Sequence, residues 1–156
     1  AKGYDDVEFM ISTNPGESLK PLSQVASGGE LSRVMLAIKA VLAGRDEIDT
    51  LIFDEIDTGI SGRTAWKVAE QLSALAGAHQ VICITHLPQI AAMADVHFVI
   101  EKSSTDDMTI TDIHRVTERE SLAELARLLG SDALTGAALS NAEEMKEQAG
   151  RFKESR

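Results

Sequence analysis

The chain has 156 residues, of which 44% are hydrophobic and 26% charged, a composition typical of one globular domain. Lysine and arginine number 15 against 25 aspartates and glutamates, so the net charge is −10. This excess of negative charge excludes a broad nucleic acid-binding surface as the main feature of the segment, because nucleic acids are bound mostly through cationic side chains.

The N-terminal third of the chain is expected to form a strand, a helix and a second strand. Residues 5–12 alternate polar and apolar side chains, which is typical of a half-buried strand. Apolar side chains then recur at helical spacing between residues 30 and 42. Residues 50–53 form a short continuous apolar run followed by two acids, the pattern of a buried parallel strand.

The rest of the chain predicts an alternation of helices and strands. In order, we expect a helix over 62–76, a buried strand over 81–85, a short helix over 88–93, strands over 96–102 and 108–116 around a polar turn at 103–107, and helices over 119–129 and 138–152. A strand–helix–strand connection of this length implies a crossover between parallel strands. The strands at 50–53 and 81–85 should therefore end at one edge of a sheet, where α/β proteins usually bind ligands.

Cysteine usage and hydropathy exclude a disulfide-stabilised domain and a membrane-spanning segment. The single cysteine, Cys83, cannot form an intrachain disulfide, and its apolar neighbours indicate a buried structural thiol in a reducing compartment. No apolar stretch approaches the roughly 20 residues of a membrane span, so we expect no membrane partner. The chain begins at Ala1 rather than methionine, and we expect it to be a piece of a longer protein.

Two compatible interpretations apply to Ser27, Gly28, Gly29 and Glu30, which precede the first long helix. In the structural interpretation, Ser27 caps the helix and the Glu30 side chain returns to it, forming a capping box. In the functional interpretation, the two glycines let the backbone approach a ligand closely and expose N–H groups at the positive end of the helix dipole. Such a site suits a phosphate.

Polar residues follow the two strands of the predicted crossover. Asp54 could hold Mg²⁺, and Glu55 could orient or deprotonate an attacking water. His86, expected beside Glu55, could donate to a terminal phosphate. The competing interpretation is a pair of solvated acids and a structural histidine. Asp57, in the next loop, is by itself an ordinary turn aspartate.

Together these segments resemble the second half of an ABC-type ATPase head. The run VASGGELSR at 25–33 resembles the signature motif, and LIFDE at 51–55 resembles a Walker B strand with its catalytic glutamate. The segment 57–60 resembles the D-loop, and His86 the switch histidine. The order and spacing agree, with 27 positions from the signature serine to the Walker B aspartate and 32 from there to the histidine.

Longer runs, above all ITHLPQIAAMADVHFVIEK, are similar to the SMC-like DNA repair ATPases of bacteria over nearly the whole chain. The resemblance implies a P-loop NTPase-like α/β fold, with residues 1–156 as a single domain and a mostly parallel sheet flanked by helices. No GxxxxGK[ST] motif occurs in the sequence. In SMC-like proteins that phosphate-binding loop lies in the N-terminal half, before a long coiled coil, so the resemblance implies the C-terminal lobe alone.

The resemblance also implies the role of each site residue. Asp54 would bind Mg²⁺, Glu55 would act on the attacking water, and His86 would contact the γ-phosphate of ATP. Asp57 would lie at the interface with a second head, whose ATP would contact the signature residues Ser27, Gly28, Gly29 and Glu30. The implied partners are the N-terminal lobe of the same parent protein, a second head in an ATP-dependent dimer, and DNA through the parent protein.

The function implied is ATP-driven work in DNA double-strand break repair and recombination, in the cytoplasm and at the nucleoid. Alone, without the phosphate-binding loop, the chain is expected to be inactive. One alternative is the head lobe of another SMC-like or ABC ATPase, which the sequence upstream would distinguish, since long heptads favour the SMC-like group. Alternatives of other classes are a metal-dependent nuclease or phosphatase that uses Glu30, Glu55 and Asp57, and a non-catalytic interaction module.

Overall fold

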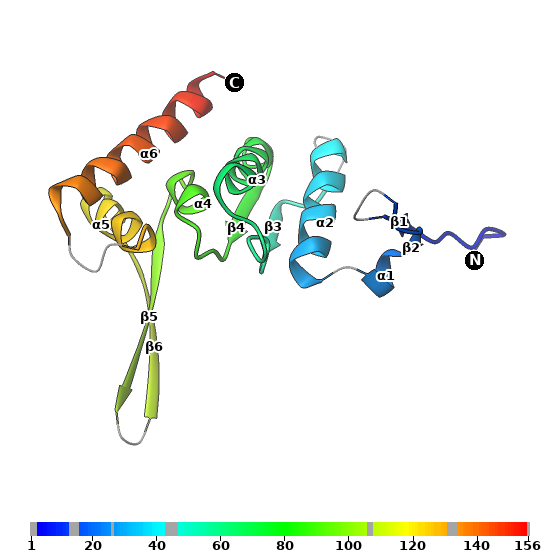
Figure 1. The fold of residues 1–156 in the computed structure, drawn as a ribbon, viewed down its shortest axis with the longest axis horizontal. Helices are drawn as coiled ribbons and strands as arrows, with labels where there is room; N and C mark the ends of the chain where they lie inside the picture. Colours follow the sequence, from blue (N-terminus) through cyan, green and yellow to red (C-terminus); the bar gives the residue numbers. More distant parts are fainter. Residues whose placement is uncertain are drawn as a thin grey trace.

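The computed structural model describes residues 3–12, 16–25, 27–42, 47–105, 108–130 and 134–155. In chain order its elements are β1 (Met10–Ile11), β2 (Lys20–Pro21), α1 (Leu22–Val25), α2 (Gly28–Leu42), β3 (Thr50–Phe53), α3 (Gly62–Leu75), β4 (Gln80–Cys83), α4 (Pro88–Ala92), β5 (Phe98–Thr105), β6 (Met108–Arg115), α5 (Glu118–Leu128) and α6 (Gly136–Glu154). They follow one long axis, from β1 and β2 at one end to α5 and α6 at the other (Figure 1). The α/β fold class is confirmed.

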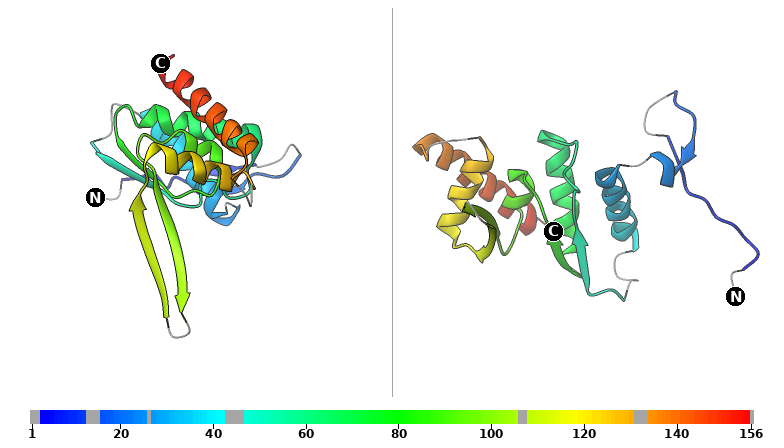
Figure 2. Two further views of the ribbon diagram at one scale, coloured as in Figure 1. Left: turned by 90° about the vertical axis from the view of Figure 1, so that its left-hand side faces the viewer. Right: turned by 90° about the horizontal axis from the view of Figure 1, so that it is seen from below.

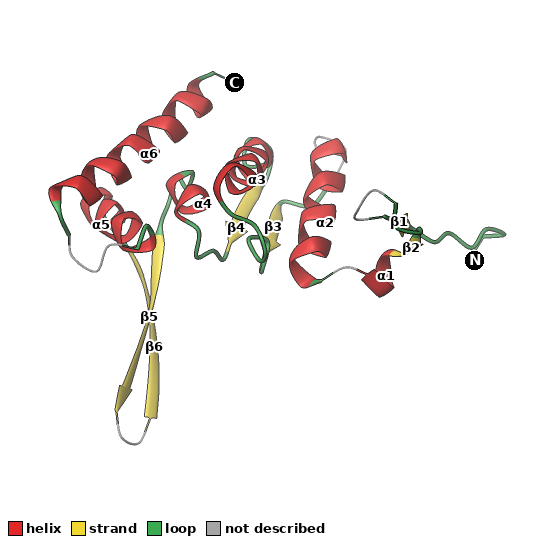
Figure 3. Cartoon of the chain, viewed as in Figure 1, coloured by secondary structure: helices red, strands yellow, loops and turns green. Residues whose placement is uncertain are grey.

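The described strands form three two-stranded sheets, shown in yellow in Figure 3. β3 and β4 pair in parallel with Phe53 opposite Cys83, and the N–H of Ile84 donates to the Phe53 carbonyl oxygen at 3.0 Å. The other two pairs, β1–β2 and β5–β6, are antiparallel. The predicted crossover through α3 is therefore confirmed, and the segments that follow β3 and β4 leave the same edge.

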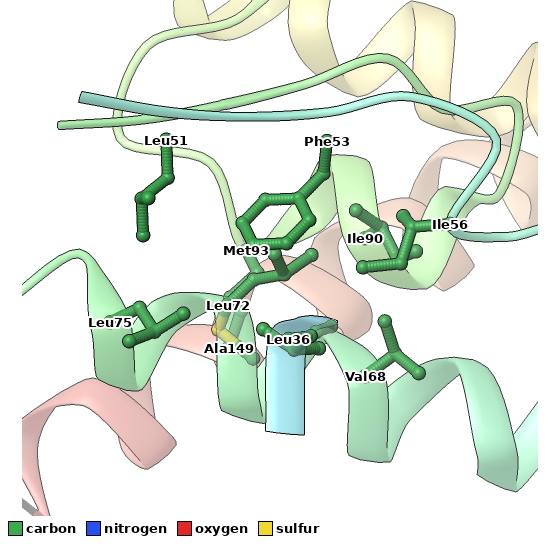
Figure 4. Close-up of a cluster of buried hydrophobic side chains, with 11 residues drawn as sticks. Leu36, Leu51, Phe53, Ile56, Val68, Leu72, Leu75, Ile90, Met93 and Ala149 are labelled. Carbon is green, nitrogen blue, oxygen red and sulfur yellow. The ribbon is translucent and has the colours of Figure 1, made fainter. Parts of the chain in front are cut away.

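The main core lies under one face of the parallel pair. Leu51 and Phe53 point from β3 toward α3, where Leu72 and Leu75 meet them (Figure 4). The full cluster of buried side chains is Leu36, Leu51, Phe53, Ile56, Val68, Ala69, Leu72, Leu75, Ile90, Met93 and Ala149. Because α3 repeats apolar residues at helical spacing and alternate β3 side chains point to the same face, one stripe of the helix covers one face of the strands.

The opposite face of this sheet is open, and here the expectation of strands buried on both faces is wrong. Ile52, Ile82 and Ile84 point to that face and are 68%, 45% and 49% exposed. Their apolar character predicts burial, yet all three remain largely exposed. The parallel pair therefore carries an exposed patch of β-branched residues, called here the open isoleucine face.

A second cluster joins the C-terminal helices to α4. Its buried members are mostly alanines, namely Ala91, Ala92, Leu125, Ala126, Ala138 and Ala142. Small side chains let α4, α5 and α6 approach closely, and a capping box between Thr117 and Glu120 begins α5. Among the described residues, no helix is both long enough and apolar enough to cross a membrane.

The β5–β6 hairpin projects from the body of the molecule (Figures 1 and 2). β5 extends further than expected, because Ser103 and Thr105 pair with Ile110 and Met108 where the sequence predicts a turn, whereas β6 agrees with expectation to within one residue. Polar residues favour turns only statistically, and a ladder of backbone hydrogen bonds accommodates serine and threonine. The remaining turn residues, 106–107, lie outside the described part of the chain.

The N-terminal segment differs most from expectation. Of the strand expected over residues 5–12, only Met10–Ile11 pairs, with Lys20–Pro21. Val7 and Phe9 are exposed, so the alternating pattern lacks a surface to cover. The single turn of α1 was not predicted, and α2 begins at Gly28 instead of residue 30.

Replacing Ile56, which is fully buried, should test how strongly the core holds the loop after β3. We expect Ile56→Ala to lower the free energy of unfolding of the chain by about 2–5 kcal/mol, because it leaves a cavity. The control Ile52→Ala, on the open isoleucine face, should cost less than about 1 kcal/mol. Urea unfolding followed by circular dichroism measures both, and equal losses would contradict the assignment.

Candidate functional site

The loop after β3 changes from exposed to buried side chains within four residues. Asp54 and Glu55 are exposed, whereas Ile56 is fully buried and Asp57 is also buried. Glu55 has φ +56°, the left-handed conformation, and no other described non-glycine residue has a positive φ. This conformation costs an L-residue about 1–2 kcal/mol. The Asp54 carboxylate accepts the Glu55 N–H at 2.9 Å, and the N–H of Thr58 donates to the Glu55 carbonyl at 3.0 Å.

The start of α2 contains the capping box that the sequence predicts. The N–H of Ser27 donates to Glu30 Oε2 at 2.9 Å, and the N–H of Glu30 donates to Ser27 Oγ at 3.3 Å. The structural interpretation of this segment is therefore confirmed. Ser27 is exposed, and since its hydroxyl oxygen accepts this bond, its own hydrogen can still donate to a ligand.

The two glycines of this helix start face the chain's own loop, and Gly29 is required there because the loop backbone lies against it. A Cβ atom on Gly29 would lie 2.7 Å from the carbonyl oxygen of Glu55 and 2.9 Å from Cβ of Thr58. A Cβ atom on Gly28 would collide with Glu55 Oε2. The Glu55 carboxylate thus lies against the first turn of α2, where the helix dipole favours a negative charge. The sequence predicts that the glycines let a ligand approach the backbone closely. In the structure, the loop after β3 makes this close approach.

Two polar side chains of α2 hold the backbone of this loop. Nη1 of Arg33 donates to the carbonyl oxygens of Ile56 and Thr58 at 3.0 and 2.9 Å. The Ser32 hydroxyl donates to the Asp54 carbonyl at 2.9 Å. Sequence reasoning missed both residues, because their partners are main-chain carbonyls, which have no sequence signature.

Asp57 is 3% exposed, and one of its carboxylate oxygens accepts two hydrogen bonds and lies close to the His86 ring. The Thr85 hydroxyl, the N–H of His86 and Nδ1 of His86 lie 2.6, 2.8 and 3.0 Å from Oδ2. The His86 side chain itself is 71% exposed. The imidazole contacts Asp57, and no sequence pattern predicts this pairing across 29 positions.

The structure brings most of the predicted residues to one region. Asp54, Glu55 and Asp57 follow β3, His86 follows β4 at the same edge, and the start of α2 lies against the β3 loop. Among the described residues, no three histidine, cysteine or acidic side chains are grouped as a metal site. Glu30, Glu55 and Asp57 therefore do not form the cluster that a metal-dependent nuclease would need.

A single exposed carboxylate is nevertheless compatible with Mg²⁺. Asp54 Oδ1 accepts one backbone hydrogen bond, which orients the carboxylate while its second oxygen faces solvent. Magnesium in nucleotide sites is commonly held by one or two carboxylates, with water and phosphate oxygens completing the octahedron. Asp54 thus fits a metal brought in with a nucleotide better than a metal bound by this chain alone.

Cys83 fits its predicted structural role. Burial, with smaller contributions from the negative charges of Asp57 and Asp54, raises the pKa of its thiol to about 12. The thiol is therefore protonated at neutral pH, and since the thiolate is the reactive form, Cys83 is a poor nucleophile.

A hollow of about 540 Å³ lies elsewhere, between the turn after α4 and the helices α5 and α6. His97, Ser121 and Lys146 line it, and none of the predicted site residues does. Nδ1 of His97 lies 2.9 Å from the Ser121 hydroxyl, and burial lowers the pKa of both His97 and Lys146. This hollow is separate from the edge that gathers the acids.

No protein-family model matches the chain. The chain is 52% identical over 143 residues to the DNA repair protein RecN of Treponema pallidum, 47% over 152 residues to that of Bacillus subtilis, and 49% over 145 residues to that of Deinococcus radiodurans. These matches cover 92%, 97% and 93% of this chain but only 25%, 26% and 25% of the relatives. The chain thus spans about a quarter of the length of the curated relatives it matches.

A solved structure supports the fold independently. It comes from work on ATP-driven dimerization and DNA-stimulated activation of SMC ATPases, and superposes with a TM-score of 0.50 at 18% identity, over 80% of this chain and 81% of that one. This likeness supports the α/β fold, and the sequence relatives confirm the resemblance to bacterial DNA repair proteins.

Substituting the two glycines separately should distinguish packing from ligand contact. Gly29→Ala should destabilise the chain by about 1–3 kcal/mol, because its Cβ meets main-chain atoms that cannot move away cheaply. Gly28→Ala should cost less, since its Cβ meets only the end of the flexible Glu55 side chain. Thermal and urea unfolding of the two variants measure this difference, and a Gly28→Ala variant as unstable as Gly29→Ala would contradict it.

Proposed function

We propose that this chain, a homologue of about a quarter of the bacterial DNA repair proteins called RecN, forms the C-terminal lobe of an SMC-like ATPase head. The observation that carries the proposal is the edge of the parallel pair β3–β4. There the Asp54–Glu55 pair and the His86 loop emerge side by side, against a glycine-containing helix start. Parallel α/β sheets bind their ligands at this edge.

Within one head, three side chains would serve hydrolysis. Asp54 would hold Mg²⁺, which neutralises charge on the phosphates of bound ATP. Glu55 would orient and deprotonate the attacking water, and His86 would donate to the γ-phosphate as negative charge develops there. Next to Glu55, the carbonyl oxygen of Ile56 is held by Arg33 and the Ile56 side chain is buried, while the exposed Glu55 carboxylate can rotate away from Gly28 toward a substrate.

The start of α2 would serve the nucleotide of a second head. Ser27 and Gly28 are exposed and therefore accessible to another molecule, and the Ser27 hydroxyl has a hydrogen left to donate. Gly29 and Glu30 support this surface from within, through close packing and the capping box. ATP would then lie between two heads, and the loop that begins at Asp57 would lie at their interface.

The N-terminal lobe of the same parent protein would complete the site and the fold. This sequence has no GxxxxGK[ST] motif, so the lysine that holds the β- and γ-phosphates must come from elsewhere. The open isoleucine face offers that lobe an apolar surface of Ile52, Ile82 and Ile84. We propose that residues 1–156 act as one domain of a protein that works on DNA breaks in the cytoplasm, at the nucleoid.

The role of Glu55 can be tested in the full-length protein. Glu55→Gln should still bind ATP and dimerise, but its turnover should fall by about 10²–10⁴-fold, because the amide cannot accept a proton from water. Phosphate release measures turnover, and size-exclusion chromatography with ATP measures dimerisation. The control Glu101→Gln, on the exposed hairpin, should behave as the unsubstituted protein. A Glu55→Gln variant with normal turnover would refute the assignment.

The chain alone should hydrolyse ATP only at the background rate, because nothing in its sequence replaces the phosphate-binding loop. Adding the separately produced N-terminal half of the parent protein should raise phosphate release above that rate. Turnover by the isolated chain, abolished by Glu55→Gln, would show that the site is complete without the second half.

A further inference from the structure

Among the described residues, Asp57 is the one buried acid. A single oxygen of its carboxylate, Oδ2, lies beside the imidazole ring of His86. We propose that Asp57 is a positioning residue for His86: it fixes the ring through Nδ1 and presents Nε2 to the ligand. This inference rests on the proposed function, in which His86 contacts the terminal phosphate. It gives Asp57 a role within its own head, beyond the interface between heads.

The contacts of Asp57 define both the backbone and the ring of His86. Its Oδ2 accepts the His86 N–H at 2.8 Å and lies 3.0 Å from Nδ1 of the same residue. The Thr85 hydroxyl donates to the same oxygen at 2.6 Å and accepts the N–H of Leu87 at 3.0 Å. The turn between β4 and α4 is thus hydrogen-bonded around one buried carboxylate.

The position of Asp57 ties this turn to the acids. Only Ile56, fully buried, separates Asp57 from Glu55, and Arg33 holds the carbonyl oxygen of Ile56. A shift of the β3 loop therefore displaces Asp57, and with it the imidazole. Through these contacts, Asp57 holds the backbone of Glu55 and the side chain of His86 at a constant distance from each other.

The chemistry of the contact selects one form of the ring. An unprotonated Nδ1 would turn its lone pair toward the carboxylate oxygen 3.0 Å away, so the contact favours a proton on Nδ1 and leaves Nε2 as the nitrogen available to a ligand. To donate to a phosphate, Nε2 must carry a proton as well. A buried aspartate orients the histidine of serine proteases in the same manner.

The chain contains a matched pair for comparison. On the exposed hairpin, Nδ1 of His114 lies 3.2 Å from Asp112 Oδ2, but Asp112 is largely exposed. The pair has the same two residue types without burial and without a bond to the histidine backbone. Asp112→Asn and Asp112→Ala are therefore controls for the loss of an aspartate beside a histidine.

The first experiment observes the ring directly. Nitrogen-15 NMR of the 156-residue chain, which has four histidines, reports which ring nitrogen of neutral His86 is protonated. We expect the proton on Nδ1 in the unsubstituted chain, and its transfer toward Nε2 in Asp57→Ala. The Asp112 variants should change His114 and leave His86 as it is. An unchanged His86 ring in Asp57→Ala would overturn the proposal.

The second experiment measures ATP turnover in the full-length protein. Asp57→Ala should lower kcat at least about tenfold, because a misplaced catalytic group costs rate steeply, and should leave KM for MgATP within about twofold. Asp57→Asn, which keeps an oxygen acceptor, should recover part of kcat. A purely structural role for Asp57 would instead change KM and kcat together, or change neither, and would overturn the proposal.

Further variants keep the test decisive if Asp57→Ala does not fold. Thr85→Val removes one donor to Asp57 and should lower kcat, whereas Thr85→Ser keeps the hydroxyl and should restore it. Equal kcat in these two variants would count against the proposal. If the ring responds to Asp57→Ala as expected while kcat is unchanged, the positioning contact stands and the role of His86 in the proposed function falls. The NMR result therefore tests the positioning contact, and kcat tests the role of His86, so that a failure of one claim can be told from a failure of the other.

Discussion

The burial of the Ile56 side chain between two acids determines the arrangement of the whole candidate site. Ile56 enters the core beneath β3, with the exposed Glu55 before it and the buried Asp57 after it. The abrupt change of direction is accommodated by the left-handed conformation of Glu55. Strained backbone of this kind persists only where surrounding contacts over-determine it, and it is concentrated at functional sites.

Those surrounding contacts come from α2. Arg33 and Ser32 donate hydrogen bonds to three carbonyl oxygens of the loop, at every second position from 54 to 58. Gly29 lets the helix approach the loop backbone directly. The helix start and the acidic loop are thus one rigid unit, although more than twenty residues separate them in sequence. A ligand bound at Ser27 and a ligand bound at Asp54 would contact the same unit from two sides, which offers a physical route for coupling between two nucleotide sites.

Sequence reasoning succeeded where side-chain periodicity was strong and failed where an outcome depended on distant partners. The helices α3, α5 and α6, the parallel pair and the capping box at Ser27 follow from local patterns, and the structure confirms them. The strand expected at 5–12 failed, because alternation indicates a strand only if some surface covers its apolar side. Within the site, the common edge for the acids and His86 was predictable from topology. The contacts of Arg33 and Asp57 were not predictable. Arg33 bonds to main-chain carbonyl oxygens, and Asp57 bonds to a turn almost thirty residues further along the chain.

The open isoleucine face bears on how such a lobe reaches its folded state. Three β-branched side chains on adjacent parallel strands, exposed together, resemble the surfaces through which chains associate wrongly. Contacts between sequence-distant halves form slowly, because a long loop must close before they contribute. In a newly synthesised lobe, the open isoleucine face would therefore stay exposed, and prone to association with other chains, until such a loop has closed.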